Sequence, residues 1–169
     1  SNSLAISKGH SKGVEVVKEI VEESVKQNVS SLTLYAFSSE NWSRPKSEID
    51  AIKKLVVRAI SEQVPELKKQ KVKLKFFGEI KDFGSKILSK INNAEAETSS
   101  YKPVLSLNVA LGYGGRQDLV NVAKKISYKV VSGEIKSEQI NEAMISDFSC
   151  SPVDDIDLLI RTGGDKRIS

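Results

Sequence analysis

The chain has 169 residues, 39% of them hydrophobic and 28% charged, with a net charge of +4. These values are typical of one globular domain with a sizeable core, and they exclude a disordered chain. No apolar run approaches the roughly 20 residues that a membrane-spanning helix needs. One cysteine and one histidine exclude an internal disulfide and a zinc cluster. We expect Cys150 to be structural rather than nucleophilic, because His10 lies far from it in the sequence.

The first half of the chain alternates between helix-like and strand-like apolar spacing. A helix is predicted over about residues 12–27, and a strand follows at residues 31–37. Ser47 and Asp50 have the spacing of a capping box, which predicts the start of a second helix. Pro65 is expected to kink that helix or to divide it into two pieces.

The second half continues this alternation and predicts the fold class. No hairpin turn separates the strands, which favours a parallel α/β sheet flanked by helices in a single domain, residues 1–169. The elements predicted here are a strand at 72–77, a helix around 83–91, a strand at 104–111, a helix at about 116–130 that Gly133 ends, a short helix near 137–147 and a fourth strand at 156–160.

The densest basic run holds lysines 68, 69, 71, 73 and 75 and passes from a helix end into the strand at 72–77. Because apolar residues alternate with Lys73 and Lys75, we expect these lysines to face solvent at the edge of the sheet. Neither clustered arginines with interleaved aromatics nor a known binding module accompanies them. The positive charge therefore favours anionic partners only weakly, and nucleic acid is not predicted.

Three polar loops follow predicted strands, at residues 38–44, 112–116 and 161–169. In open parallel sheets, ligands bind beyond the carboxyl ends of the strands, so we expect these loops to converge on one site. The last loop places Arg161, Arg167 and Ser169 around a glycine pair, which suits a diphosphate or a carboxylate. An ordinary surface loop explains it equally well on spacing alone. The glycines at 112–115 are explained by a tight turn between a strand and a helix.

His10 lies between Gly9 and Gly13, at the N-terminus predicted for the first helix. An imidazole and free helix amides at that point can bind a phosphate, although a lone histidine is more often a cap or a surface group. The sequence contains no nucleophile elbow and no evident base for covalent catalysis.

Three stretches taken together, "LTLYAFSSENWSRP", "LNVALGYGGRQDLV" and "DLLIRTGGDKRIS", with support from "KGHSKG", resemble the cis-prenyltransferase family. They are most similar to its bacterial members that make undecaprenyl diphosphate. The resemblance implies a parallel sheet flanked by helices that is not a Rossmann fold. It also implies a hydrophobic tunnel that holds the growing chain.

The implied activity is the addition of isopentenyl diphosphate units to an allylic diphosphate such as farnesyl diphosphate, with cis double bonds. The product is a long-chain polyprenyl diphosphate, the lipid carrier for cell-wall synthesis. The resemblance further implies a need for Mg²⁺, a homodimer, and a cytoplasmic enzyme that works near the membrane.

The resemblance also assigns roles to residues. Asn41 and Ser38 are placed beside the reacting centre, with Asn41 as a proton acceptor or orienting group. His10 is placed against a substrate diphosphate, where it assists proton or phosphate handling. The remaining implied substrate contacts are Ser39, Glu40, Trp42, Arg44, Glu48, Arg161, Arg167, Ile168 and Ser169.

The chain departs from the family pattern in four places. The "MDGNGRW"-type motif with its catalytic aspartate and a later metal-binding glutamate are not found, so Mg²⁺ ligands are expected in segments outside this chain. Ile6 stands where the family usually has arginine, and Asp165–Lys166 where Glu–His is usual. We therefore expect the chain as given to be a fragment or ordered core without prenyltransferase activity.

Two other functions are compatible with these residues. One is a nucleotide- or diphosphate-binding α/β module that uses the glycine and arginine loops. The other is a non-catalytic partner subunit of a prenyltransferase, against which the retained "SSENWSRP" loop argues.

Overall fold

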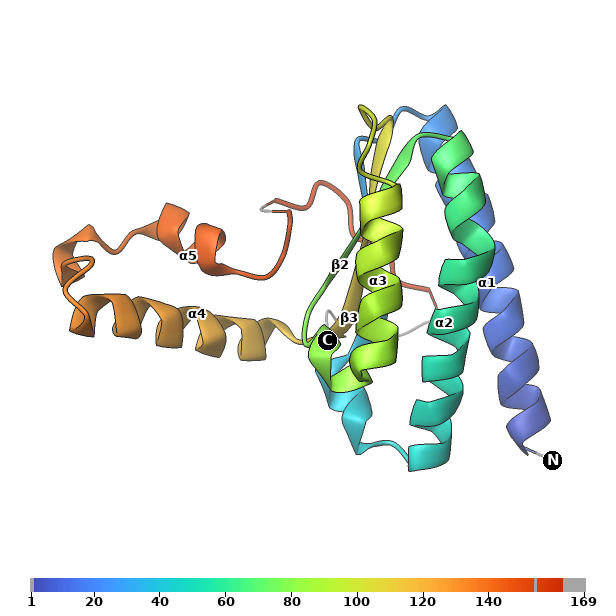
Figure 1. Cartoon of the computed structure of the whole chain (residues 1–169), viewed down its shortest axis with the longest axis horizontal. Helices are drawn as coiled ribbons and strands as arrows, with labels where there is room; N and C mark the ends of the chain where they lie inside the picture. Colours follow the sequence, from blue (N-terminus) through green and yellow to red (C-terminus); the bar gives the residue numbers. More distant parts are fainter. Residues whose placement is uncertain (1, 154, 163–169) are drawn as a thin grey trace.

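Three parallel strands form the centre of the structure, a computed structural model that describes the backbone of residues 2–153 and 155–162 and the side chains from residue 13 onward in those ranges. The strands are β1 (Ser31–Ser38), β2 (Val72–Phe77) and β3 (Leu105–Tyr113), in the spatial order β1-β3-β2. Three helices cover one face of this sheet (Figure 1): α1 (Asn2–Lys26), α2 (Lys46–Lys69) and α3 (Ser85–Glu97). The parallel α/β class predicted from the sequence is thus confirmed.

Strand β2 shows how the sequence pattern builds the core. Val72, Leu74 and Phe76 are buried, whereas the intervening Lys73 and Lys75 are exposed. The apolar side of the strand packs with α2 and α3 in a single hydrophobic cluster. The solvent-facing lysines at a sheet edge are confirmed, because β2 is the outer strand next to β3.

Helix α3 covers the outer edge of β2. The N–H of Leu74 donates to Thr98 Oγ1 at 3.1 Å, and the N–H of Phe76 donates to Glu95 Oε1 at 2.6 Å. The hydroxyl of Tyr101 donates to the carbonyl of Val72 at 2.8 Å. These side chains satisfy backbone groups that would otherwise form an unpaired strand edge.

Beyond β3 the chain forms an arm that projects away from the helix-covered side of the sheet (Figure 1). It consists of α4 (Gly115–Val131), the short η3 (Ser137–Gln139) and α5 (Glu142–Phe148). Asp118 on α4 accepts hydrogen bonds from Ser149 Oγ at 2.6 Å and from the N–H of Cys150 at 3.1 Å. This buried carboxylate holds the turn after α5 against the start of α4.

The predicted fourth strand is wrong. Residues 155–162 form no strand, and the side chains of Leu158 and Ile160 are 75% and 76% exposed. Within the described residues β1 pairs only with β3. Segment 155–162 is therefore not hydrogen-bonded to the other edge of β1 as a strand. An apolar sequence favours a strand, but backbone pairing with a neighbour is what forms one.

Three helix details also differ from expectation. Helix α1 begins at Asn2 rather than near residue 12. Pro45 is the N-cap of α2 and no side chain caps that end, so the Ser47–Asp50 capping box is not formed. Pro65 lies inside α2 without dividing it. Pro65 is exposed, so its ring meets solvent rather than the packed face, and the surrounding hydrogen bonds hold the helix together.

Among the described residues, no helix combines the length and the apolar character required to span a bilayer.

Candidate functional site

The loop after β1 is a closed 3-10 turn, η1 (Ser39–Ser43), held by its own side chains. Ser38 Oγ accepts the N–H of Glu40 at 3.1 Å, and Asn41 Oδ1 accepts the N–H of Ser38 at 2.9 Å. Because the oxygen of Asn41 is used in this way, its NH₂ group remains available to donate elsewhere. Ser43 Oγ donates to the carbonyl of Glu40 at 2.8 Å and completes the turn.

Arg44 and Glu48 stand where η1 joins α2. An Arg44 guanidinium nitrogen lies 3.9 Å from Glu48 Oε2, and both side chains are partly exposed. The N–H of Arg44 donates to the carbonyl of Asn41 at 3.1 Å. A surface ion pair of this kind is weak, so the guanidinium is free to exchange the carboxylate for another anion.

Trp42 packs inward from η1 onto the aromatic side chains beneath it. Its ring centroid is 5.0 Å from that of Phe37 and 4.8 Å from that of Phe83, the last residue of η2 (Ile80–Phe83). Phe37 and Phe83 are buried and belong to the core cluster. The ring therefore anchors the turn to the core; it does not line either of the large cavities described below.

The glycine turn after β3 lies against η1. A Cβ on Gly114 would overlap Ser39 Oγ and crowd Ser39 Cβ at 3.3 Å, so a larger residue would force Ser39 to move. Gly112 has a φ of +71° and would bring a Cβ to within 3.4 Å of the Phe83 ring. These two glycines have structural roles, as the tight-turn interpretation predicts, and they bring the second polar loop to the first.

An apolar cavity of about 340 Å³ opens between α1, α2 and the sheet. Among the described residues that line it, Gln63 alone has a polar side chain. Its size falls within the range of about 300–1,000 Å³ that is usual for ligand pockets. Other lining residues include Val14 and Val17 of α1, Leu55, Val56 and Ala59 of α2, and Ala36 and Val109 of the sheet.

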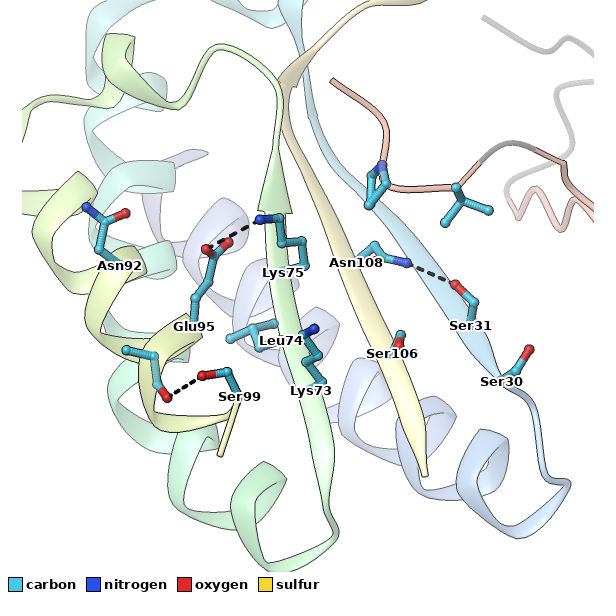
Figure 2. A pocket seen from close by; sticks show the side chains of 13 residues that line it. Ser30, Ser31, Lys73, Leu74, Lys75, Asn92, Glu95, Ser99, Ser106 and Asn108 are labelled. Carbon is cyan, nitrogen blue, oxygen red and sulfur yellow. Dashed lines mark hydrogen bonds and ion pairs between the residues drawn. The ribbon is translucent and has the colours of Figure 1, made fainter. Parts of the chain in front are cut away.

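A second, polar cavity of about 960 Å³ lies on the opposite face of the sheet (Figure 2). Lys75 pairs there with Glu95 at 3.9 Å, and Asn108 Nδ2 donates to Ser31 Oγ at 3.0 Å. Charged and hydroxyl groups line this groove, so it does not suit an apolar ligand. The two faces of one sheet thus carry opposite chemistries.

The resolved pKa shifts do not indicate a general acid or base near neutral pH. Cys150 is exposed as a residue, but partial desolvation of its sulfur raises the pKa of the thiol to about 11, and the neighbouring carboxylate of Asp118 adds to this shift. Burial also raises the pKa of Tyr113. Within the described residues, no group of three or more histidine, cysteine, aspartate or glutamate side chains is placed to hold a metal ion.

The structure brings together only part of the predicted site. Ser38, Ser39, Glu40, Asn41, Trp42, Arg44 and Glu48 lie on one stretch of chain, from the end of β1 through η1 to the first turn of α2, with Trp42 packed inward. His10 lies within α1 and not at its N-terminus, because the helix begins eight residues earlier, and its side chain lies outside the described ones. Arg161 is exposed at the end of segment 155–162. Arg167, Ile168 and Ser169 lie outside the described residues.

Sequence reasoning did not identify the residues that support and extend this site. Phe83 and Lys53 contact Trp42 from η2 and α2, and no motif marks them. The helical apolar spacing around Leu55, Val56 and Ala59 is visible in the sequence. That spacing does not distinguish a face that packs fully from one that lines a cavity.

Comparison with known proteins places the chain in a family. The family model described as putative undecaprenyl diphosphate synthase matches residues 1–169. The ditrans,polycis-undecaprenyl-diphosphate synthase ((2E,6E)-farnesyl-diphosphate specific) of Pectobacterium atrosepticum is 39% identical over 162 residues, 95% of this chain and 64% of that protein. An isoprenyl transferase of Prochlorococcus marinus is 40% identical over 167 residues, 98% of this chain and 61% of that protein. The chain thus spans about three fifths of the length of these curated relatives.

Two solved structures share the fold. Lavandulyl diphosphate synthase from Lavandula x intermedia, in complex with dimethylallyl diphosphate, superposes with a TM-score of 0.81 at 27% identity, covering 85% of this chain and 61% of that one. A probable undecaprenyl diphosphate synthase from Campylobacter jejuni gives a TM-score of 0.72 at 31% identity, covering 85% of this chain and 66% of that one.

Proposed function

Because the chain belongs to the undecaprenyl diphosphate synthase family, we propose that the whole protein is a cis-prenyltransferase that condenses isopentenyl diphosphate with an allylic diphosphate such as farnesyl diphosphate. The observation that carries the proposal is the apolar cavity next to a polar turn. Ala36 lines the cavity and lies two residues before Ser38, which caps η1. Figure 1 shows that the start of α2 and the start of α1 lie at this same end of the sheet. A ligand can therefore place its charged head at η1 and its apolar tail between α1, α2 and the sheet.

The turn η1 supplies hydrogen-bond donors for the head group. The NH₂ group of Asn41 makes no hydrogen bond within the described part of the chain, and the guanidinium of Arg44 is held only by the weak pair with Glu48. Guanidinium and amide donors bind diphosphate oxygens well. Because hydrogen bonds already fix the turn, little ordering is needed when the ligand binds.

In the proposed reaction, the C1–O bond of the allylic diphosphate breaks and the diphosphate leaves with the electron pair. The double bond of isopentenyl diphosphate forms a new bond from its C4 to that C1, and a proton leaves its C2 to create the new double bond. Donors that stabilise the leaving diphosphate lower the barrier. Since Asn41 Oδ1 already accepts the Ser38 N–H, we assign Asn41 to orienting the diphosphate rather than to accepting the proton.

The apolar cavity has two further tasks in this proposal. It buries the hydrocarbon tail, each buried methylene contributing about 0.8 kcal/mol to affinity. It also keeps water from the electron-deficient C1, which water would otherwise capture. The proposed product is a long polyprenyl diphosphate, of the undecaprenyl type, that serves as a lipid carrier for cell-wall synthesis.

Several further parts of this proposal concern the metal, the remaining substrate contacts and the assembly. Mg²⁺, which would neutralise diphosphate charge when bound, is proposed to use ligands in segments outside this chain. His10, Arg161, Arg167, Ile168 and Ser169 are proposed to contact substrate diphosphates. A homodimer in the cytoplasm, close to the membrane that receives its product, completes the proposal.

The test is incorporation of radiolabelled isopentenyl diphosphate into a butanol-soluble product by the whole protein, with farnesyl diphosphate and Mg²⁺. We expect a long-chain product, and we expect the 169-residue chain alone to make none. A thermal-shift comparison should show stabilisation of the whole protein by farnesyl diphosphate rather than by nucleotides. Stabilisation by nucleotides without incorporation would instead support a nucleotide-binding module.

A further inference from the structure

We propose that Lys53 is a positioning residue for η1, the turn that forms the proposed head-group site. Lys53 lies two turns into α2, and its Nζ is 5.3 Å from the centroid of the Trp42 ring and 5.9 Å from that of Phe83. The same ammonium donates to the carbonyl of Asp82 at 3.4 Å. One side chain thus joins α2, η1 and η2.

The contacts of Trp42 explain why such a link matters. Its ring packs edge-on against Phe37 and is tilted against Phe83, but its buried Nε1 has no hydrogen-bond partner. Within the described part of the chain the indole is therefore positioned by its ring contacts and its packing on the core cluster, without a hydrogen bond. A cation over an indole face is a directional attraction, stronger where the pair is partly desolvated, and Lys53 is half-buried.

The position of Trp42 is coupled to that of the donors. Trp42 follows Asn41 directly in a five-residue turn whose hydrogen bonds run between Ser38, Glu40 and Asn41. A shift of the indole would be expected to displace Asn41 as well, because the two residues are adjacent in a short hydrogen-bonded turn. Phe83 is a fixed support, since it is buried and lies against the Gly112 turn. Lys53 contacts both rings from α2 and is the second support of the Trp42 indole.

This inference deepens the proposed function and rests on it only for its kinetic consequence. Leu55 and Val56 wall the apolar cavity within one turn of Lys53 on the same helix. The helix that holds the tail of the ligand thereby also sets the turn that holds its head. Lys53 contacts aromatic rings and a carbonyl, not the proposed reacting atoms, so its role is positioning rather than catalytic.

The first test is made on the 169-residue chain, which holds one tryptophan, so that fluorescence reports on Trp42 alone. Lys53→Met removes the charge and keeps the aliphatic stem, and Lys53→Gln is a second neutral variant. Lys53→Arg retains a cation, and Lys54→Met, at an exposed neighbour, is the matched control. We expect acrylamide quenching of Trp42 to rise about twofold in the two neutral variants, and to stay at the wild-type level in the other two. Thermal melts verify that each variant is folded.

The second test measures kinetics in the whole protein. We expect Lys53→Met to raise KM for the allylic diphosphate about three- to tenfold, with a smaller change in kcat, and Lys53→Arg to restore it. Identical quenching and KM for Lys53→Met and Lys54→Met would overturn the inference. A rise in quenching in a protein whose wild type forms no prenyl product would leave the positioning role supported and show that the proposed function is wrong.

Discussion

Gly114 lies directly against Ser39, which puts the loops after β1 and β3 in contact at the carboxyl end of the sheet. A methyl group on Gly114 would overlap Ser39 Oγ and lie 3.3 Å from Ser39 Cβ, so Ser39 would have to turn and shift to accept it. The register explains the meeting, since Ser38 at the end of β1 pairs with Tyr113 at the end of β3. The glycine turn after β3 thus packs against η1 and supports it.

Gly114→Ala is expected to displace η1. Overpacking at this contact should lower the free energy of unfolding by about 1–3 kcal/mol and weaken diphosphate binding. Gly115→Ala is the matched control, because a Cβ there meets only Tyr113 Oη at 4.0 Å. Urea denaturation of the single variants, of Ser39→Gly and of the Gly114→Ala/Ser39→Gly pair measures the coupling. Strict additivity of the pair would show that the contact is not the cause.

Ala59→Phe is expected to shorten the apolar cavity. The ring fills space between α1, α2 and the sheet, so the whole protein should make shorter prenyl products, while the fold retains most of its stability. Ala51→Phe on the exposed side of the same helix is the control and should leave product length unchanged. Thin-layer chromatography of dephosphorylated products compares the two. Equal product lengths from the Ala59→Phe and Ala51→Phe proteins would show that the prenyl chain does not occupy this cavity.

Thr98→Val is expected to destabilise the edge of β2. Thr98 is fully buried, its Oγ1 accepts the Leu74 N–H, and it donates to the carbonyl of Ala94 at 2.9 Å. Valine has the same shape but leaves that N–H without a partner, which should cost about 1–3 kcal/mol of unfolding free energy. Ser99→Ala, at an exposed neighbour, should change it by less than about 0.5 kcal/mol. Equal urea unfolding midpoints for the Thr98→Val and Ser99→Ala proteins would contradict the role given to Thr98.

The thiol of Cys150 is expected to react slowly at neutral pH. Although Cys150 is exposed as a residue, partial desolvation of its sulfur and then Asp118 raise its pKa to about 11, so the thiolate fraction at pH 8 should be about a hundredfold below that of an ordinary thiol. The alkylation rate with iodoacetamide should rise steeply up to pH 11. Asp118→Asn removes the negative charge but not the burial, so it should restore only part of the rate. An ordinary rate in the wild type at pH 8 would contradict this shift.

The sequence was sufficient to predict the three strands that form, because each is a short apolar or alternating run of the length typical of a strand. The alternation of lysine with apolar residues in β2 marked both the strand and its position at the sheet edge. The turn at η1 was also recognisable, since a polar run follows directly on an apolar strand.

Other features depend on partners that periodicity does not show. Residues 156–160 are as apolar as a strand, but their backbone pairs with no strand of the described sheet. Strand β3, by contrast, is hydrogen-bonded to a strand on each side. The sequence predicted that α2 begins at a Ser47–Asp50 capping box, but the helix begins at Lys46 with Pro45 as its N-cap. Proline is compatible with the entry to a helix, so the start lies before the expected capping residues.

The site could be predicted only in its first loop, where strand end, polarity and family motif coincide. Lys53 in α2 and Phe83 in η2 contact Trp42 only in the folded structure. Their spacing in the sequence therefore does not predict these contacts. The cavity beside Ala36 likewise results from how α1 and α2 sit on the sheet.

The central claim is that a prenyl diphosphate binds with its head at η1 and its tail in the apolar cavity. A crystal structure of the whole protein with a non-hydrolysable farnesyl thiodiphosphate tests it most directly. We predict thiodiphosphate oxygens within hydrogen-bond distance of Asn41 and Arg44, and a hydrocarbon tail between Val56, Ala59 and Val109. A tail in the polar groove beside Lys73 and Asn108, or a head group remote from η1, would contradict the claim.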